Sequence, residues 1–134
     1  MRYRLLDHTA DALIESYGET LSERFANAAY AMFDQITDAS VVRPVGEITI
    51  SIEADTNERL LVDFLQELLY LHDTQNLVFG EFEVHIRNGS LEAVARGEEF
   101  DQSRHQKRAV VKGVTYHGLN IDDEQRRIVV LLDV

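Results

Sequence analysis

Polar side chains that could do chemistry gather near the start of the chain, in the stretch DHTAD. It lies between two apolar runs typical of a protein core and contains Asp7, His8, Thr9 and Asp11. Carboxylate oxygens are the ligands that hard cations such as Ca²⁺ and Mg²⁺ take, and a histidine can orient such a ligand or bind a softer metal. Aspartate and threonine are also typical of turns, where they hydrogen-bond to nearby backbone groups. These five residues alone favour a turn, with a cation site as the alternative.

A second group of oxygen ligands stands at the other end of the sequence. Residues 128–132, IVVLL, are typical of a buried strand, and Asp133 and Val134 follow them. If the strand is ordered to its end, the Asp133 side chain and the Val134 main-chain carboxylate are neighbouring anions that repel each other. A cation would relieve that repulsion, above all if Asp11 converged on the same place. A frayed, solvated end is the simpler interpretation of these residues alone.

The stretch VKGVTYHGL, residues 111–119, carries two more candidates. Lys112 sits between apolar neighbours, which is typical of an edge lysine that keeps its amine in water or of a functional cation. His117 is five residues further along and therefore faces the other side of a regular strand. It is either a core histidine bonded to a carbonyl or a functional group. His72 fits the C-terminal end of a helix, where a cation complements the helix dipole.

Composition restricts the class of protein. A chain of 134 residues that is 45% hydrophobic, with one proline, predicts a single domain over residues 1–134. The absence of cysteine excludes thiolate chemistry, and no P-loop, GxGxxG, HExxH or GxSxG motif is present. The net charge of −11 disfavours strong direct contact with nucleic acid. Without an apolar run of membrane-spanning length or a secretory signal, we expect a cytoplasmic protein with no membrane contact.

Two helices are predicted from apolar residues that recur at helical spacing. One covers residues 20–36, where Thr20 and Glu23 match a capping box. The other covers residues 57–73, with Asn57 as its cap. Because this second helix is apolar on more than one face, we expect it to be buried between two layers.

Strands are predicted from alternating or continuous apolar runs, and Asn88-Gly89 predicts a hairpin turn between two of them. The predicted strands cover residues 3–6, 12–17, 46–53, 77–87, 91–99, 109–119 and 126–132. Strands that follow the helices in a block indicate an α+β fold rather than an alternating parallel one. We therefore predict two helices packed between mainly antiparallel β-sheets, in β/α/β layers.

Several motifs in matching order resemble the archease family along nearly the whole chain. They are HTAD (8–11), FANAAYAMFDQI (25–36), FLQELLYLHD (64–73), VKGVTYHGL (111–119) and the final Asp133-Val134. The resemblance implies an archease-like α+β fold and a protein that is not itself an enzyme. It implies an accessory protein that activates an RtcB-type RNA ligase, its protein partner, in tRNA splicing or RNA repair. Such proteins promote guanylylation of the manganese-dependent ligase and support its multiple turnover.

The resemblance also implies which residues act. It assigns a divalent cation, calcium first and magnesium or manganese as alternatives, to Asp11, Asp133 and Val134. Lys112 resembles a lysine implicated in function, whereas His8 and His117 are motif positions without an assigned role. The family commonly reads HTADIGI where this chain reads HTADALI. Because Leu13 replaces a glycine, we expect different backbone geometry just after Asp11.

Two other classes of function stay open. One is a general chaperone or adaptor for nucleic-acid-processing enzymes, to which the acidic charge would contribute. The other is a metal-dependent hydrolase that uses Asp11, Asp133 and His117, although the sequence offers it no convincing general base.

Overall fold

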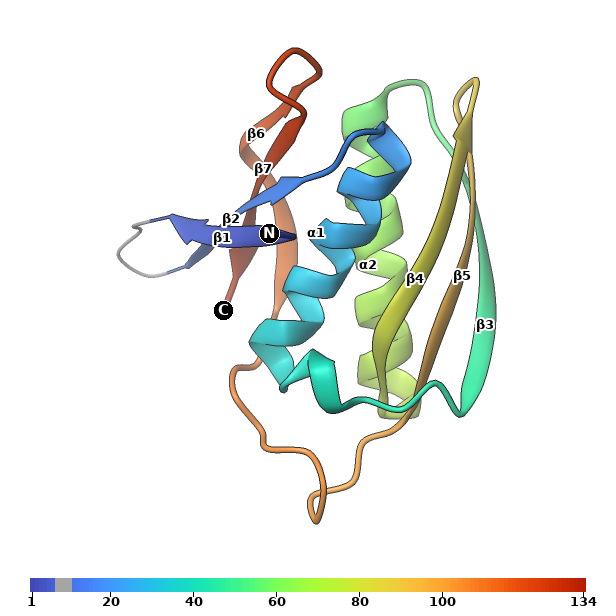
Figure 1. The fold of residues 1–134 in the computed structure, drawn as a ribbon, viewed down its shortest axis with the longest axis vertical. Helices are drawn as coiled ribbons and strands as arrows, with labels where there is room; N and C mark the ends of the chain where they lie inside the picture. Colours follow the sequence, from blue (N-terminus) through green and yellow to red (C-terminus); the bar gives the residue numbers. More distant parts are fainter. Residues whose placement is uncertain (7–10) are drawn as a thin grey trace.

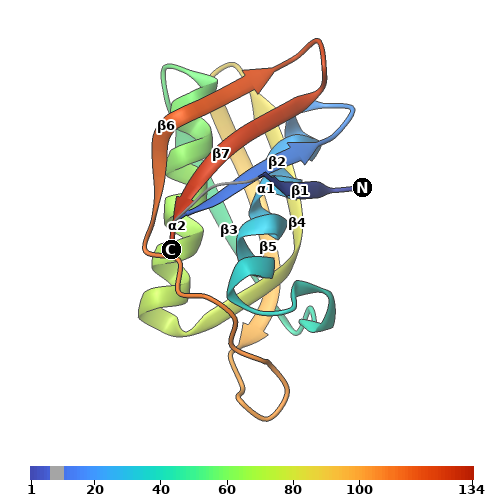
Figure 2. The same ribbon diagram turned by 90° about the vertical axis from the view of Figure 1, so that its left-hand side faces the viewer.

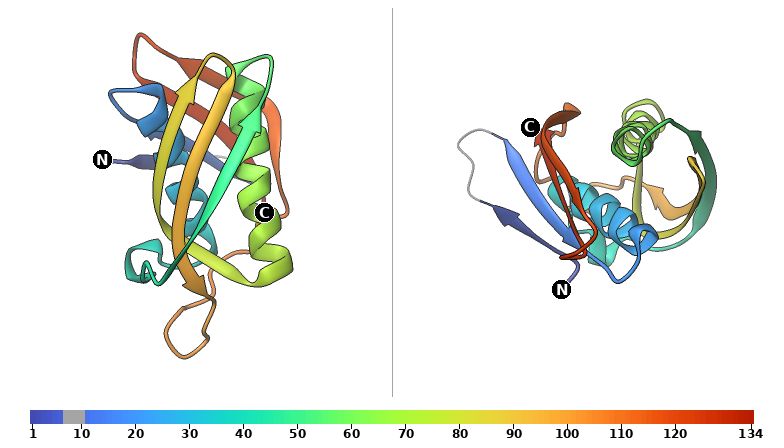
Figure 3. Two further views of the ribbon diagram at one scale, coloured as in Figure 1. Left: turned by 90° about the vertical axis from the view of Figure 1, so that its right-hand side faces the viewer. Right: turned by 90° about the horizontal axis from the view of Figure 1, so that it is seen from above.

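Two helices lie between two antiparallel sheets in the computed structural model, which describes residues 1–6 and 11–134 (Figure 1). One sheet has the strand order β1-β2-β7-β6 and the other has the order β3-β5-β4. The elements are β1 (Tyr3–Leu6), β2 (Ala12–Tyr17), α1 (Leu21–Ile36), a 3-10 turn (Ala39–Val41), β3 (Gly46–Glu53), α2 (Asn57–Gln75), β4 (Leu77–Arg87), β5 (Ser90–Glu99), β6 (Gly113–Asp122) and β7 (Arg127–Asp133). The predicted α+β fold with helices between sheets is confirmed, and Figure 3 shows the layers from above.

Aromatic side chains join the helices to each other and to one sheet. Phe33 of α1 meets Phe79 of β4 edge-on, with 5.4 Å between ring centroids, and lies 5.9 Å from Phe82. Phe25 of α1 stacks against Phe64 of α2 at 6.4 Å. Such pairs add to the hydrophobic free energy of burial. The core therefore runs without interruption from sheet to sheet through the helices.

The start of α1 follows the predicted capping pattern with one change. The Thr20 hydroxyl accepts a hydrogen bond from the backbone N–H of Glu23 at 3.1 Å, as a capping box requires. The Glu23 carboxylate accepts from the backbone N–H of Glu19 at 3.0 Å rather than from that of Thr20. One more backbone donor before the helix is thereby satisfied.

The cap of α2 differs from the prediction. Thr56, not Asn57, is the N-cap, and its hydroxyl accepts from the backbone N–H of Arg59 at 3.1 Å. Asn57 is already the first helical residue. The helix also runs to Gln75, two residues beyond the prediction, and ends where Asn76 takes a left-handed conformation with φ 57°.

The strand predicted from residue 109 begins four residues later, at Gly113. The backbone N–H groups of Arg108 and Ala109 donate instead to the carbonyls of Ile36 and Gln35, each at 2.9 Å. These carbonyls close the C-terminal end of α1 and have no partner within the helix. The end of α1 thus takes up the backbone of Ala109, which the apolar pattern assigns to a strand, and of Arg108 before it.

The predicted hairpin turn is confirmed, since Asn88 and Gly89 both have positive φ, 49° and 78°, between β4 and β5. Within residues 1–6 and 11–134, neither helix combines the length and the apolar character that crossing a bilayer requires.

Candidate functional site

The register of β2 and β7 brings Asp11 and Asp133 to the same end of the sheet. The two strands are antiparallel, and their pairing reaches Ala12 opposite Leu132. Asp11 directly precedes β2, and Asp133 is the last residue of β7. Figure 2 shows the start of β2 beside the end of β7. Two carboxylates that are far apart in the sequence therefore lie at the same end of adjacent strands.

The last strand is ordered to its end. Asp133 pairs with Gly113 of β6 on the side away from β2. The backbone N–H of Lys112 donates to the Asp133 carbonyl at 2.6 Å, and the Val134 side chain packs against the core. The frayed end that the sequence alone suggested is wrong. We call the Asp11 and Asp133 side chains and the main-chain carboxylate of Val134 the acidic tip.

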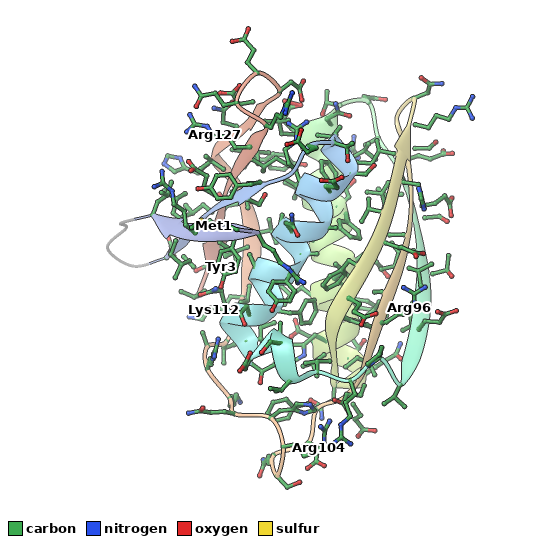
Figure 4. The ribbon with its side chains drawn as sticks, in the orientation of Figure 1. Met1, Tyr3, Arg96, Arg104, Lys112 and Arg127 are labelled. Atoms are coloured by element: carbon green, nitrogen blue, oxygen red, sulfur yellow. The ribbon has the colours of Figure 1, made fainter. Side chains whose placement is uncertain are left out.

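Lys112 lies at the same strand end, where Figure 4 labels it. It directly precedes Gly113, which pairs with Asp133, and its backbone N–H bonds to the Asp133 carbonyl. It is exposed. Lys112 is therefore an exposed cation at the edge of the acidic tip.

Leu13 stands two residues after Asp11 in the sequence. It pairs with Leu6 and with Leu131, and the Leu131 side chain is only 4% exposed. Leu13 lies within β2 and has no positive φ. The change in backbone geometry relative to the family stays a prediction. Leu13 and Leu131 place apolar side chains at the positions next to the acidic tip.

His117 belongs to a bulge. The register of β6 against β7 shifts between Thr115 and Asn120, and Gly118 takes a φ of 71° within this segment. His117 is exposed, and its backbone N–H donates to the Thr115 hydroxyl at 2.8 Å. It is neither a core histidine nor aligned with the acidic tip along the strand. The prediction for His8 lies outside the described residues.

The donors of the acidic tip fit a hard cation, because all of them are oxygens on adjacent, paired strands. In the chain outside residues 7–10, no three His, Cys, Asp or Glu side chains gather as metal ligands. The tip supplies two side chains and one main-chain carboxylate, whereas Ca²⁺ takes 6–8 oxygen ligands. A cation held here would complete its shell with water or with oxygens from another molecule.

Sequence analysis did not find His105, a buried histidine that is 2% exposed. The backbone N–H of Asp101 donates to its Nδ1 at 2.8 Å, so the neutral ring carries its proton on Nε2. Nε2 lies 3.0 Å from the Glu98 carboxylate and donates to it. Both partners lie within seven residues of His105, so the only indication in the sequence was the short spacing of these three polar residues. This histidine holds the loop that leads from β5 to Lys112.

A buried ion cluster is centred on Glu15, which lies in β2 four residues after Asp11. Glu15, 4% exposed, accepts from the Tyr17 hydroxyl at 2.6 Å and pairs with Arg4 and Arg127 at 3.0 and 3.2 Å. The hydrogen bond from Tyr17 and the two guanidinium groups hold the pKa of Glu15 below its ordinary value, although burial alone would raise it. The cluster ties β1, β2 and β7 together.

The free energy of unfolding is expected to fall as the pH drops below about 4.5, the ordinary pKa of a glutamate. Because the folded-state pKa of Glu15 lies lower, its stabilisation is complete above that value and is lost as the pH falls through the folded pKa. Urea titrations at pH 6, 4.5 and 3 measure this. In the Glu15→Gln variant, which cannot titrate, the decrease should be shallower, and an unchanged slope would contradict the assignment.

The known proteins that match this chain in sequence belong to one family. A model of the Archease protein family (MTH1598/TM1083) matches residues 3–134. The protein archease of Pyrococcus furiosus is 44% identical over 120 residues, 87% of this chain and 84% of the relative. That of Sulfurisphaera tokodaii is 38% identical over 125 residues, 92% of this chain and 90% of the relative.

Solved structures show the same fold. The solution structure of Methanobacterium thermoautotrophicum protein 1598 matches with a TM-score of 0.85 and 37% identity, over 99% of both chains. A crystal structure from Thermotoga maritima, described as "an archease, possible chaperone", matches with a TM-score of 0.65 over 98% of this chain and 96% of that one. At 16% identity, the second likeness concerns the fold alone.

Proposed function

Because this chain belongs to the archease family, we propose that it is an accessory protein that activates an RtcB-type RNA ligase. Its task is to promote guanylylation and multiple turnover of the ligase in tRNA splicing or RNA repair. The observation that carries the proposal is the register of β2 on β7, which puts Asp11 and Asp133 at the same end of adjacent strands.

The acidic tip is the proposed contact with the ligase. Asp11, Asp133 and the Val134 carboxylate would hold a divalent cation, calcium first and magnesium or manganese as alternatives. A bound cation offsets the mutual repulsion of the carboxylates and offers open positions to phosphate or carboxylate oxygens of the partner. Lys112, exposed at the same strand end, would bind a second anionic group. The chain itself then positions groups and forms no covalent bond.

Two alternative functions receive less support. A metal-dependent hydrolase would need His117 as a base beside the two aspartates, and His117 lies in the bulge several residues along β6 from Gly113, which pairs with Asp133. A general chaperone or adaptor for nucleic-acid-processing enzymes is compatible with the acidic charge but gives no role to the acidic tip.

A short extension after Val134 is expected to abolish activation. Adding Gly-Ser-Gly-Ser converts the main-chain carboxylate into an amide and places a chain over the acidic tip. In a single-turnover guanylylation assay with the cognate ligase, the stimulated rate should fall more than tenfold. The matched control carries the same four residues before Met1, which is 92% exposed, and should keep full stimulation. Equal stimulation by both proteins would contradict the proposal.

Calcium is expected to raise the midpoint of thermal unfolding. A ligand at one hundred times its Kd stabilises a folded protein by about 2.7 kcal/mol, which is a rise of several degrees for a domain of this size. The Asp133→Asn variant should lose this rise, whereas Asp55→Asn, an exposed residue in the loop before α2, should keep it. The same shift in Asp133→Asn would place the cation elsewhere.

A further inference from the structure

The outer edge of β3 has no partner in the described part of the chain. β3 pairs with β5 alone, and outside that pairing no hydrogen bond among the described residues reaches the backbone of residues 46–53. The strand has eight residues and no proline, so it lacks two of the devices that usually protect an edge. Its backbone therefore offers a row of donors and acceptors to another strand.

The inner face of β3 is also incompletely covered. Ile48 and Ile52 point toward the helices and remain partly exposed. The residues directly opposite them on β5, Ala95 and Leu91, are fully buried. Apolar surface at the edge is thus left for a neighbouring chain to cover.

α2 lies beside an edge strand of each sheet, β3 and β6, and its contacts with the two strands differ. Figure 3, in its left view, shows β3 in front of α2, with the helix extending past the strand on its open side. At the edge of the other sheet, the Gln66 side chain of α2 donates a hydrogen bond to the Val114 carbonyl of β6 at 3.3 Å. The helix therefore satisfies a backbone acceptor of β6 and leaves β3 open.

A groove of about 470 Å³ runs between β3 and the exposed flank of α2. We call it the β3–α2 groove; its lining residues are Ser51, Ile52, Glu53, Asp63, Gln66, Glu67 and Tyr70. Three of them are acidic and none is basic. The Tyr70 side chain is 59% exposed. The groove thus combines negative charge, an aromatic surface and a free backbone edge.

Only one of the three acids has an ion-pair partner among the described residues. Asp63 pairs with Arg59 one helical turn earlier, at 3.6 Å, whereas Glu53 and Glu67 form no salt bridge there. A basic group that enters the groove would meet two carboxylates without displacing another cation.

We propose that the β3–α2 groove binds an extended, basic segment of a partner protein, which adds to the sheet as a strand beside β3. Main-chain hydrogen bonds supply affinity in this mode, and alternate side chains supply specificity. Lysine or arginine side chains that point toward α2 would meet Glu67 and the ring of Tyr70. Basic side chains on the other face of the added strand would meet Glu53, which alternates with Ile52 along β3. A second copy of this chain fits poorly, because its own β3 carries Glu47 and Glu53. The proposal stands independently of the acidic tip.

The test uses the peptide acetyl-Lys-Val-Lys-Val-Lys-Val-amide as a probe, titrated into the full-length protein and followed by amide NMR. The shifted resonances should come from β3 and the facing side of α2, and alternate β3 amides should gain protection from hydrogen exchange. The double variant Glu53→Gln/Glu67→Gln should bind the peptide at least tenfold more weakly. The control Glu124→Gln, in the turn between β6 and β7, should bind like the unmodified protein.

A second peptide separates strand addition from simple charge attraction. When every backbone nitrogen of acetyl-Lys-Val-Lys-Val-Lys-Val-amide is methylated, the charge is the same, but no residue of the peptide can donate to a sheet ladder. The methylated peptide should bind at least tenfold more weakly. Equal affinity for the two peptides, or shifts spread over the whole acidic surface, would overturn the proposal. So would concentration-dependent dimerisation that the first peptide reverses, because β3 would then pair with a second copy.

Discussion

A protein that carries Asp11→Asn is expected to leave the guanylylation rate of the ligase at the level that the ligase reaches alone. Asparagine keeps the size of the side chain and removes its charge, so any loss concerns the anion and not the packing. Asp11 directly precedes β2, at the end of the sheet where β7 ends with Asp133, and it supplies one of the two side chains of the acidic tip. We expect the stimulated rate to drop more than tenfold, in line with the loss of a metal ligand or its support.

The measurement is the same single-turnover assay with equal concentrations of ligase and activator. Asp55→Asn makes the same chemical change at an exposed loop position and should stimulate fully. Thermal unfolding of both variants shows whether the fold is retained. If Asp11→Asn stimulates as well as the control, the acidic tip has no part in activation, whatever binds there.

Phe33→Ala is expected to lower the free energy of unfolding by about 3–5 kcal/mol. The Phe33 side chain is completely buried, and its ring meets those of Phe79, Phe82 and His72 at 5.4, 5.9 and 6.2 Å. Truncation removes these contacts and leaves a cavity that helices fixed between two sheets cannot close. The midpoint of thermal unfolding should fall by roughly 10–20 °C.

Urea titration of Phe33→Ala beside Tyr70→Ala gives the comparison. Tyr70 is also an aromatic residue of a helix, but it is 59% exposed, and its loss should cost no more than about 0.5 kcal/mol. Phe33→Leu should lie between the two. A loss below about 1 kcal/mol for Phe33→Ala would show that the aromatic contacts do not hold α1 to its sheet.

Local patterns predicted most of the fold. Residues 3–6, 12–17 and 46–53 are strands over the predicted bounds, because alternation and flanking turn residues are properties of the segment itself. The predictions were wrong where contacts with distant parts of the chain determine the local structure. The N–H groups of Arg108 and Ala109 bond to the end of α1, and the bulge at residues 116–119 exists only through its pairing with β7. Neither can be inferred from the segment alone.

The candidate site was harder to predict for a similar reason. The register of β2 on β7 puts Asp11 and Asp133 at the same end of adjacent strands, and no spacing in the sequence encodes which strands become neighbours. The family resemblance grouped these residues, and their role as cation ligands stays a prediction. His105 could not be predicted either, although its partners Glu98 and Asp101 are close to it in the sequence. Their hydrogen bonds to the ring form only when the loop folds around the buried histidine.

The position of β7 has a consequence for synthesis of the protein. β7 lies between β2 and β6, so an interior strand of this sheet is synthesised after all the other described strands. Until it is made, β6 lacks the one strand that pairs with it among the described residues, and Ile14 of β2 lacks its partner Val130. Such late, long-range pairing delays folding of the nascent chain. A chain cut short before residue 127 would lose the sheet and the acidic tip together, so a translation error that removes the site also exposes the core to proteolysis.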